Sequence, residues 1–253
     1  MGRLQDHVAV VTGAAGGIGQ QMSVALAREG ATLVLVDLGG CENTVAEIEG
    51  SGGQAVAFQG DVSDAAGMQS IVDQAVERFG RVDALINNAA MLGGGERTDF
   101  DQIDESQWDK VMAVNVKGVW NCCKAVVPQM KQQGRGRIVN ISSMTIWMGM
   151  PYLLHYSASK GAVLTLTRSL SRELQGTGIC VNGITPGYHA TDAAQSLAGA
   201  DFETSRLRML EKQIVKRTGT ASDLNGAAVF LASDESEFIT GQFINVDGGI
   251  SHH

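Results

Sequence analysis

Short apolar runs and helix-like segments alternate along nearly the whole chain of 253 residues. The apolar runs are rich in valine and isoleucine and end at glycine, asparagine, aspartate or serine, a pattern typical of buried strands. They span residues 7–13, 32–37, 54–61, 82–90, 136–143, 178–187 and 241–249. Segments with helical periodicity separate them at residues 17–30, 41–52, 65–80, 106–134, 157–176 and 221–234. This alternation predicts βαβ units and therefore parallel strands with right-handed crossovers.

The fold class expected from this pattern is α/β, with one doubly wound, Rossmann-type parallel sheet of about seven strands and helices on both faces. No repeat, linker or change in composition divides the chain, so we expect residues 1–253 to form a single domain. Residues 188–218 depart from the rhythm, because they are polar and mostly helical in pattern yet lie between the last two strands. We expect them to overhang the carboxyl edge of the sheet as a substrate lobe or lid.

Charge and composition exclude several classes of partner. The net charge of −8 would repel a phosphate backbone and an anionic membrane, so neither nucleic acid nor a membrane is an expected partner. No apolar run approaches the roughly 18 residues of a membrane span, and we expect a cytoplasmic protein. The cysteines show no C-x-x-C spacing, so no disulfide framework and no metal site are predicted. They are Cys41, Cys122, Cys123 and Cys180.

A glycine-rich loop, "TGAAGGIG", follows the first predicted strand and opens the first predicted helix. Gly13 would allow the tight turn, Gly17 would let the backbone approach a pyrophosphate, and Gly19 would let the helix lie close to the sheet. Ile18 lies within the same turn. In this context the loop predicts a dinucleotide-binding domain, although a structural turn is the plainer interpretation of a lone glycine loop.

Asp37 ends the second predicted strand, 18 residues after Gly19. A carboxylate at this point can accept hydrogen bonds from the adenosine ribose hydroxyls and would repel a 2′-phosphate. Neither the glycine loop nor the residues just after Asp37 supply an arginine or lysine for such a phosphate. The expected cofactor is therefore NAD rather than NADP.

Two further strand ends carry candidate cofactor contacts. Asp61 and Val62 lie at the end of the third predicted strand and are expected near the adenine. Asn88 and Ala89 lie at the end of the fourth and are expected near the adenosine ribose. Each of these residues is also an ordinary choice for a turn at a strand end.

Tyr156 and Lys160 are four residues apart in "YSASK", so on a helix they share one face about one turn apart. An ammonium group at that distance favours the phenolate form of a tyrosine, and a phenolate can act as a base at a hydroxyl group. Taken alone, the pair is more often structural than catalytic.

Taken together, these pieces resemble the short-chain dehydrogenase/reductase family along nearly the whole chain. The matching residues are "TGAAGGIG" (12–19), "DV" (61 and 62), "NNAA" (87–90), Asn115, Ser143, "YSASK" (156–160), Pro186, Gly187, Thr191 and "VDGG" (246–249). The resemblance implies a catalytic tetrad of Asn115, Ser143, Tyr156 and Lys160. Tyr156 would be the acid or base, and Ser143 would orient the substrate oxygen. Lys160 would also bind the nicotinamide ribose, and Asn115 would kink its helix and hold a water.

The resemblance also implies contacts from the residues after the sixth predicted strand. The residues expected near the nicotinamide carboxamide are Pro186, Gly187, His189 and Thr191. Those expected near the nicotinamide ribose are Tyr156 and Lys160. His189 departs from the family pattern, which more often has an aliphatic residue there, and it would either contact substrate or point to solvent. Ala90 stands where the family usually has glycine.

An apolar stretch before Tyr156 suggests a substrate pocket. Its candidate contacts are Ser143, Met144, Trp147, Met150, Leu153, Tyr156 and Tyr188. The segment from 144 to 155 has no cation, which favours a neutral secondary alcohol or ketone, apolar, cyclic or aromatic. Basic residues in the lobe, Arg206, Arg208 and Lys212, weaken that argument.

Three functions stay open at this point. The leading hypothesis is an enzyme that transfers a hydride between NAD(H) and a small-molecule secondary alcohol or ketone. The alternatives are a 3-oxoacyl thioester reductase and a non-catalytic NAD(H)-binding sensor or scaffold. The family resemblance further implies a homotetramer built through the helices that contain Asn115 and Tyr156.

Overall fold

A seven-stranded, entirely parallel sheet forms the centre of the computed structural model, which describes residues 2–93, 97–191, 195–197 and 199–252. The strand order is β3-β2-β1-β4-β5-β6-β7. The strands are β1 Val8–Thr12, β2 Thr32–Asp37, β3 Gln54–Gln59, β4 Ala84–Asn87, β5 Gly136–Ile141, β6 Ile179–Pro186 and β7 Phe243–Val246. Each lies within one of the seven runs predicted from the sequence, and the doubly wound α/β fold is confirmed.

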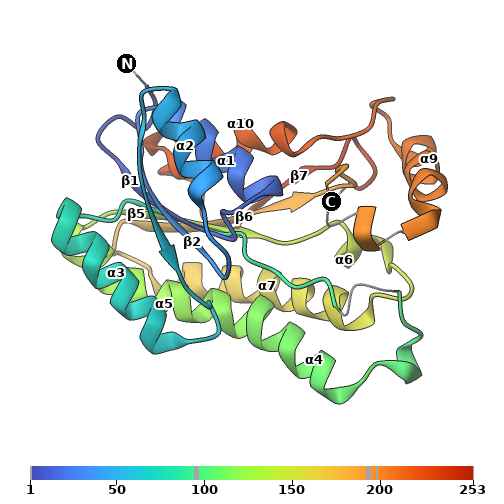
Figure 1. Ribbon diagram of the computed structural model, residues 1–253. Coiled ribbons are helices and arrows are strands. Elements are labelled where there is room, and N and C mark those ends of the chain that lie inside the picture. The colour runs from blue at the N-terminus through green and yellow to red at the C-terminus, as the bar shows by residue number, and fades with distance from the viewer. Residues whose placement is uncertain (1, 94–96, 192–194, 198, 253) are drawn as a thin grey trace.

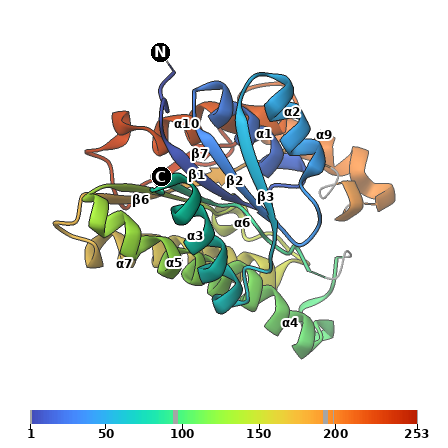
Figure 2. The ribbon, with the colours of Figure 1, turned by 60° about the vertical axis from the view of Figure 1, so that its left-hand side comes forward.

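Helices cover both faces of the sheet (Figures 1 and 2). One face carries α1 Gly17–Arg28, α2 Glu42–Gly50 and α10 Asn225–Ala232. The opposite face carries α3 Ala65–Phe79, α5 Gly118–Gln133 and α7 Leu154–Glu173, and α4 Glu105–Met112 continues this layer beyond the sheet. Further described helices are η1 Phe100–Gln102, α6 Thr145–Met148, η3 Gly199–Asp201, α9 Phe202–Lys212, η4 Ala221–Leu224 and η5 Asp234–Ser236.

Side-chain alternation along the strands divides the core into two layers. In β1, Ala9 and Val11 pack into the layer under α1 and α10, whereas Val8 and Val10 pack into the layer under α3 and α5. All four side chains are buried, because a parallel strand between helical layers has no solvent face. This two-sided burial explains why the strands read as unbroken apolar runs in the sequence.

Two differences from the sequence expectation lie near the carboxyl edge. The segment expected as one helix over residues 106–134 is α4 and α5 joined by a π-helical turn, Ala113–Lys117. The stretch interpreted as an apolar pocket wall contains a short helix, α6, which closes with Gly149 in the left-handed region at φ 60°. A four-residue helix is too short to leave a periodic signal.

The segment from Tyr188 to Thr218 leaves the sheet after β6 and returns before η4. An isolated parallel bridge between His189 and Gly219 joins the two ends of this excursion. Its main element, α9, stands outside the sheet beyond the carboxyl ends of the strands (Figure 1). Within the excursion, Arg206 Nη1 donates a hydrogen bond to Thr218 Oγ1 at 2.8 Å.

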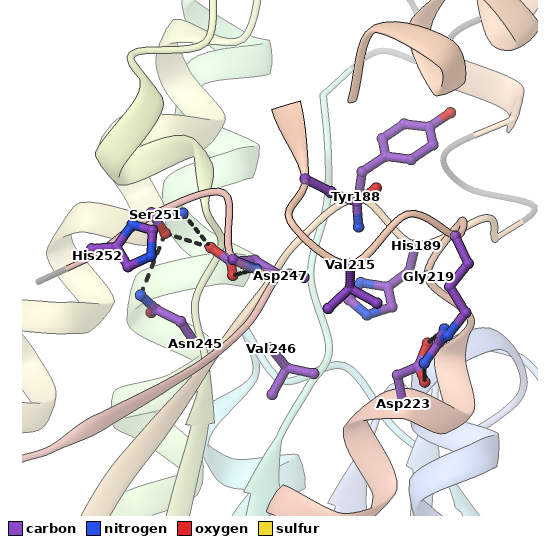
Figure 3. Close-up of a pocket in the computed structure, with 14 residues that line it drawn as sticks. Tyr188, His189, Val215, Gly219, Asp223, Asn245, Val246, Asp247, Ser251 and His252 are labelled. Atoms are coloured by element: carbon purple, nitrogen blue, oxygen red, sulfur yellow. Dashed lines mark hydrogen bonds and ion pairs between the residues drawn. The ribbon is translucent and has the colours of Figure 1, made fainter. Parts of the chain in front are cut away.

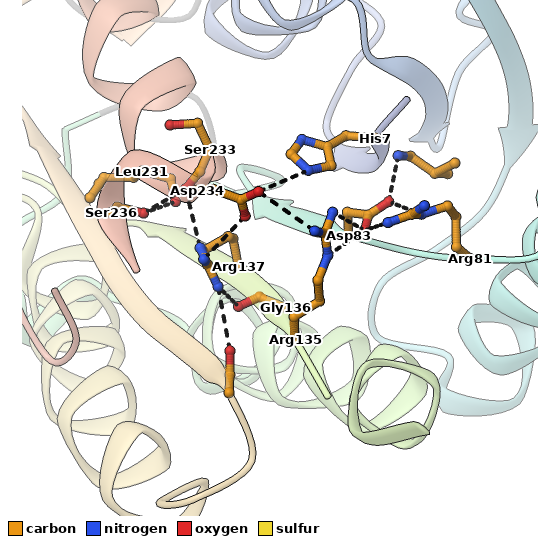
Figure 4. Close-up of polar contacts among 12 residues, drawn as sticks. His7, Arg81, Asp83, Arg135, Gly136, Arg137, Leu231, Ser233, Asp234 and Ser236 are labelled. Atoms are coloured by element: carbon orange, nitrogen blue, oxygen red, sulfur yellow. Dashed lines mark hydrogen bonds and ion pairs between the residues drawn. The ribbon is translucent and has the colours of Figure 1, made fainter. Parts of the chain in front are cut away.

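A buried carboxylate fastens the amino ends of three neighbouring strands (Figure 4). Asp83 precedes β4 and accepts hydrogen bonds from the Val8 amide at 2.9 Å and from Arg81 Nε and Nη2 at 2.7 and 2.6 Å. Arg135, just before β5, lies 3.2 Å away. Burial raises the pKa of Asp83, but the hydrogen bonds and charge of Arg81 and the Val8 amide outweigh it and leave the pKa below its ordinary value. Asp83 is therefore a charged anchor at the edge of the sheet where the amino ends of the strands lie.

The described part of the chain contains no helix long and apolar enough to cross a membrane. Its four cysteines are free and buried. Among the same residues, no group of three or more histidine, cysteine or acidic side chains could hold a metal ion.

Replacing Asp83 with asparagine should destabilise the fold by about 3 kcal/mol at pH 7, because two guanidinium groups lose a buried counter-charge. The pKa of Asp83 is lower in the folded protein than in the unfolded chain, where it is about 4. The stabilisation by Asp83 is therefore present above about pH 4 and is lost as the pH falls through the pKa of the folded protein. Urea unfolding should therefore show a parent–variant difference that shrinks below about pH 4. Asp73→Asn, on the exposed face of α3, is the control. Equal unfolding free energies for the parent and Asp83→Asn at pH 7 would contradict the anchor role.

Candidate active site

The carboxyl ends of the strands open onto a cavity of about 540 Å³. Its described lining residues come from the loops after β1, β2, β4, β5 and β6, from α6 and α7, and from the start of the 188–218 excursion. A second cavity of about 380 Å³ adjoins it and shares Gly13, Asp37, Ala89 and Ala90. The site thus lies at the point between β1 and β4 where the strand order reverses, the usual ligand site of such sheets.

The glycine loop is shaped by close backbone contacts on one side and open space on the other. Gly13 has φ 67°, and a Cβ there would lie 2.8 Å from the Ala89 Cα. A Cβ on Gly19 would overlap the Gly13 carbonyl oxygen, so the helix could not approach the turn. At Gly16 and Gly17 a Cβ would meet no protein atom within 4 Å. The loop is therefore tight against the sheet and open toward the cavity, with the amino end of α1 facing the opening.

The Asp37 carboxylate is held at the other wall of the cavity by backbone amides. Its Oδ2 accepts from the Ala15 amide at 3.0 Å, and its Oδ1 accepts from the Gly39 amide at 3.0 Å. Among the described residues that line the two cavities, the cations are Arg97 and Lys160, and neither contacts Asp37. The neighbourhood of Asp37 suits hydroxyl groups better than a phosphate.

The end of β4 supports the glycine loop. Asn88 Nδ2 donates to the carbonyl oxygens of Thr12 and Gly13 at 3.1 and 2.9 Å. Thr12 Oγ1 accepts from the Asn88 and Ala89 amides at 3.1 Å each. The Asn88 side chain thus fixes the loop, and both Asn88 and Ala89 line the main cavity. Thr12 was missed among the candidate site residues, although a polar residue at a strand end was a usable signal.

The other predicted adenosine-side residues occupy the adjoining cavity. Asp61 and Val62 line it, and Asp61 Oδ1 accepts from the Ser63 amide at 2.8 Å. Val62 also packs against α5, where a Cβ on Gly118 would lie 2.6 Å from it. These two residues are therefore beside the cleft rather than in its main cavity.

Tyr156, Ser143 and Lys160 meet on one wall of the main cavity. The Ser143 hydroxyl lies close enough to Tyr156 to favour the phenolate form and so to lower the pKa of Tyr156. Lys160 Nζ lies 5.7 Å from the centre of the Tyr156 ring and donates to the Ile141 carbonyl at 2.9 Å. Because α7 begins at Leu154, both Tyr156 and Lys160 lie in its first turns, on the face that packs against β5 and β6.

Burial dominates the electrostatics of this pair. The pKa of Tyr156 is raised by burial, which the Ser143 hydroxyl only partly offsets. Burial lowers the pKa of Lys160 to about 8. In the protein by itself, Lys160 therefore does not produce the lowered Tyr156 pKa that the sequence argument expected, because desolvation penalises both charged forms.

Asn115 occupies the middle of the π-helical turn and does not line the cavity. Its Nδ2 donates to the Met91 carbonyl and to Ser159 Oγ, both at 2.9 Å, and its Oδ1 accepts from the Met91 amide at 2.7 Å. Ser159 Oγ in turn donates to the Tyr156 carbonyl at 2.6 Å. Asn115 therefore ties the loop after β4 to the helix that carries Tyr156, and the local widening of the helix accompanies these bonds.

The end of β6 brings four predicted residues to the cavity: Pro186, Gly187, His189 and Thr191. His189 is 6% exposed and donates from Nδ1 to the Gly187 carbonyl at 3.1 Å, so it does not point to solvent. His189 also lines a separate cavity of about 460 Å³, where its ring lies beside Gly219. The Tyr188 side chain points away from the His189 ring (Figure 3). His189 is thus part of the wall between two cavities.

The rest of the cavity is largely apolar. Met144, Met150, Leu153 and Tyr188 line it as expected from the sequence, whereas Trp147 on α6 does not. Several lining residues were missed: Gly16, Leu92, Arg97, Thr145 and Leu197. Arg97 and Leu92 follow β4 in a loop without a recognisable motif, so no local signal marked them.

This arrangement can hold a hydroxyl or carbonyl oxygen beside Tyr156 and Ser143 while an extended ligand lies along the glycine loop toward Asp37. The phenol is a proton donor in its neutral form and an acceptor when ionised. The chemistry within reach is proton transfer at an oxygen beside the buried Tyr156 side chain.

Comparison with known proteins agrees with this geometry. Residues 13–251 match a family model described as enoyl-(acyl carrier protein) reductase. A 2-dehydro-3-deoxy-D-gluconate 5-dehydrogenase of Dickeya dadantii is 39% identical, over 97% of this chain and 96% of its own. A 3-oxoacyl-[acyl-carrier-protein] reductase of Thermotoga maritima is 36% identical, over 98% and 99%. A solved structure of NAD⁺-bound xylitol dehydrogenase matches with a TM-score of 0.89 and 31% identity, covering 97% of this chain and 99% of that one. The chain therefore belongs to the short-chain dehydrogenase/reductase family, whose members use nicotinamide cofactors, and it is an oxidoreductase.

Proposed function

We propose that the protein is an NAD-dependent dehydrogenase that oxidises a secondary alcohol to a ketone, or catalyses the reverse reduction. The observation that carries the proposal is the convergence of Tyr156, Ser143 and Lys160 on the cavity that also contains the open glycine loop. The reaction names of the dehydrogenase relatives support the same chemistry. Their substrates differ, so these names support a type of reaction and not a substrate.

The cofactor would lie across the carboxyl edge of the sheet. Its pyrophosphate would meet the amides at Gly16 and Gly17, its adenosine ribose would meet Asp37, and its nicotinamide end would face Pro186, Gly187 and Tyr156. When bound, the nicotinamide ring would supply the hydride acceptor or donor. The space beside Gly16 and Gly17 and the amide-anchored Asp37 carboxylate fit an NAD molecule.

The chain's own residues would move the proton. Tyr156 would take the hydroxyl proton of the alcohol during oxidation and return it to the ketone oxygen during reduction. Ser143, which lines the cavity with Tyr156, would hold the same oxygen in place. With the cofactor bound, Lys160 would add its positive charge to that of the nicotinamide and favour the phenolate, which burial disfavours in the protein by itself. Asn115 would act as a positioning residue through Ser159 and Met91.

Two alternatives have less support. A 3-oxoacyl thioester reductase would run the same chemistry in reverse, and the 36% identical reductase makes it the second candidate. Asp37 argues against the NADPH that this reading would favour. A non-catalytic NAD(H) sensor would have no need of an acid–base group on the cavity wall.

We also propose that residues 188–218 act as the substrate lobe. Tyr188 and Thr191 line the cavity, and α9 lies beyond the carboxyl ends of the strands. The His189–Gly219 bridge holds the two ends of the excursion together beside the cavity.

The oligomer we propose is a homotetramer, with α5 and α7 at one interface. Trp120 on α5 is 50% exposed, and Ala158 and Thr165 give α7 an exposed face of small residues. Phe238, fully exposed before the edge strand β7, marks a second surface suited to burial. A closed tetramer needs two such surfaces on each subunit.

Replacing Tyr156 with phenylalanine should lower kcat by at least about 100-fold, because the proton acceptor is lost while the ring still fills its site. NADH affinity, measured by fluorescence, should stay within about three-fold of the parent. Tyr152→Phe, on the surface, is the matched control. Turnover of Tyr156→Phe close to that of the parent would rule out the assigned role.

Changing Asp37 to serine together with Leu38 to arginine should move the preference from NAD toward NADP. The change removes hydrogen bonds from a charged acceptor to the ribose, which contribute about 1.5–3 kcal/mol, and supplies a guanidinium for the 2′-phosphate. The ratio of kcat/KM for NAD to that for NADP should fall at least about 100-fold. Asp73→Ser, remote from the cleft, should leave the ratio unchanged. A parent enzyme that already prefers NADPH would contradict the proposal.

Light scattering should give a mass near four times the 26.6 kDa of one chain. Trp120→Glu should reduce this mass, because it places a charge in the proposed α5–α7 interface. Phe100→Glu, which changes an exposed aromatic residue of η1, should not. A stable monomer in the parent protein would refute the tetramer.

A further inference from the structure

We propose that the substrate is a hydroxy acid, and that Arg97 binds its carboxylate while its reacting hydroxyl group lies at Tyr156 and Ser143. This inference rests on the proposed alcohol oxidation and adds the chemical class of the substrate. It replaces the neutral substrate expected from residues 144–155, because Arg97 comes to the cavity from outside that segment. Arg97 follows β4 and lines the same 540 Å³ cavity as Tyr156, Ser143 and Tyr188. A substrate that fills this cavity would therefore reach both the reacting wall and a guanidinium group.

Arg97 is held in place by a neutral partner. Its Nη2 donates to Ser205 Oγ at 2.9 Å, and Ser205 on α9 is itself 8% exposed. Among the residues that the structure describes, no carboxylate lies within ion-pair distance of Arg97. A guanidinium has five N–H donors in a planar fork, so one bond to Ser205 leaves enough donors for a bidentate carboxylate.

Arg206 provides an informative contrast within the lobe. It forms an ion pair with Glu203 and donates to Thr218, so its charge is already compensated. Both Arg206 and Arg97 lie near Tyr188, whose pKa is raised by burial and lowered in part by these two charges. Arg206 is thus paired with a carboxylate, whereas the described partner of Arg97 is the neutral Ser205 hydroxyl.

The cavity wall has no acidic group near Arg97 in the described residues. Asp37 is the carboxylate among the lining residues, and it lies at the glycine loop with two backbone amides. Lys160, the other cation, is 2% exposed and engaged with the Ile141 carbonyl. The described lining of the substrate end therefore contains an exposed arginine and no carboxylate, which favours an anionic ligand.

Two hydroxyl groups of the cavity could also form hydrogen bonds with a ligand. Tyr188 Oη and Thr145 Oγ1 are buried and have no hydrogen-bond partner in the part of the chain described, and both residues line the cavity. Buried hydroxyl groups without partners are costly, so a ligand that supplies oxygen atoms would be favoured over a hydrocarbon. A polyhydroxy or keto acid satisfies these groups and Arg97 together.

The test uses pairs of secondary alcohols that differ only in charge. Hydroxy carboxylates with one to four carbons between the carbinol carbon and the carboxylate are compared with their primary amides, using NAD and the purified protein. The expected result is a kcat/KM about ten- to a hundred-fold higher for at least one acid than for its amide, the range of a charge-assisted hydrogen bond. Arg97→Met should remove this preference and leave the amide rate within about three-fold, and Arg97→Lys should restore part of it. Arg208→Met, an exposed arginine on α9 outside the cavity, is the control and should behave as the parent.

A binding measurement separates this inference from the proposed reaction. With NADH present the alcohols cannot turn over, and the same acids should raise the thermal midpoint of the parent and of Arg208→Met more than their amides do. This difference should vanish in Arg97→Met. An acid-specific shift that depends on Arg97, without turnover of any alcohol, would support the anion site and refute the proposed reaction.

Other outcomes overturn the inference. Equal kcat/KM values and equal thermal shifts for acids and amides would show that Arg97 does not select an anion. If the neutral alcohols are then oxidised, the proposed reaction is still supported. A preference for acids that survives in Arg97→Met would place the anion elsewhere. If no alcohol is turned over and no acid-specific shift is seen, both proposals are refuted.

Discussion

Parallel pairing of all seven strands is the constraint on which the rest of the structure depends. Each parallel connection must cross over the sheet, so helices cover both faces and every strand ends at the same edge. The chain winds outward from β1 to β3, returns to β4 beside β1, and so leaves a reversal point at that edge. The glycine loop, Asp37 and Ser143 are distant in sequence and meet there because each follows a strand.

Backbone groups hold most of the polar side chains of the site. Lys160 is bound to the Ile141 carbonyl, Asp37 to the Ala15 and Gly39 amides, and Asn115 to both backbone groups of Met91. A buried polar group is stable only when its hydrogen bonds are satisfied, so these bonds also fix the geometry of the site. At the opposite edge, Asp83 joins the amino ends of β1, β4 and β5 in the same way.

Prediction from sequence was most successful where a pattern repeats. The seven strands and the long helices leave periodic signals, and the Tyr156–Lys160 spacing placed both residues on one face of α7. It was least successful where geometry depends on distant partners. Trp147 was expected to line the cavity but is not among its described lining residues, and the bonds by which Asn88 fixes the glycine loop were not indicated by the sequence. The raised pKa of Tyr156 required its burial to be known.

The sequence by itself determined the α/β fold, the strand ends and the identity of the groups offered to the cleft, because periodicity and turn residues are local properties. Only the tertiary structure decided which of those groups share a cavity. It brought Arg97 from the loop after β4 to the cavity that Tyr156 lines, set Ser205 beside it, and buried His189 between two cavities. Such contacts join residues separated by up to about a hundred positions, and they depend on side-chain packing that no local pattern encodes.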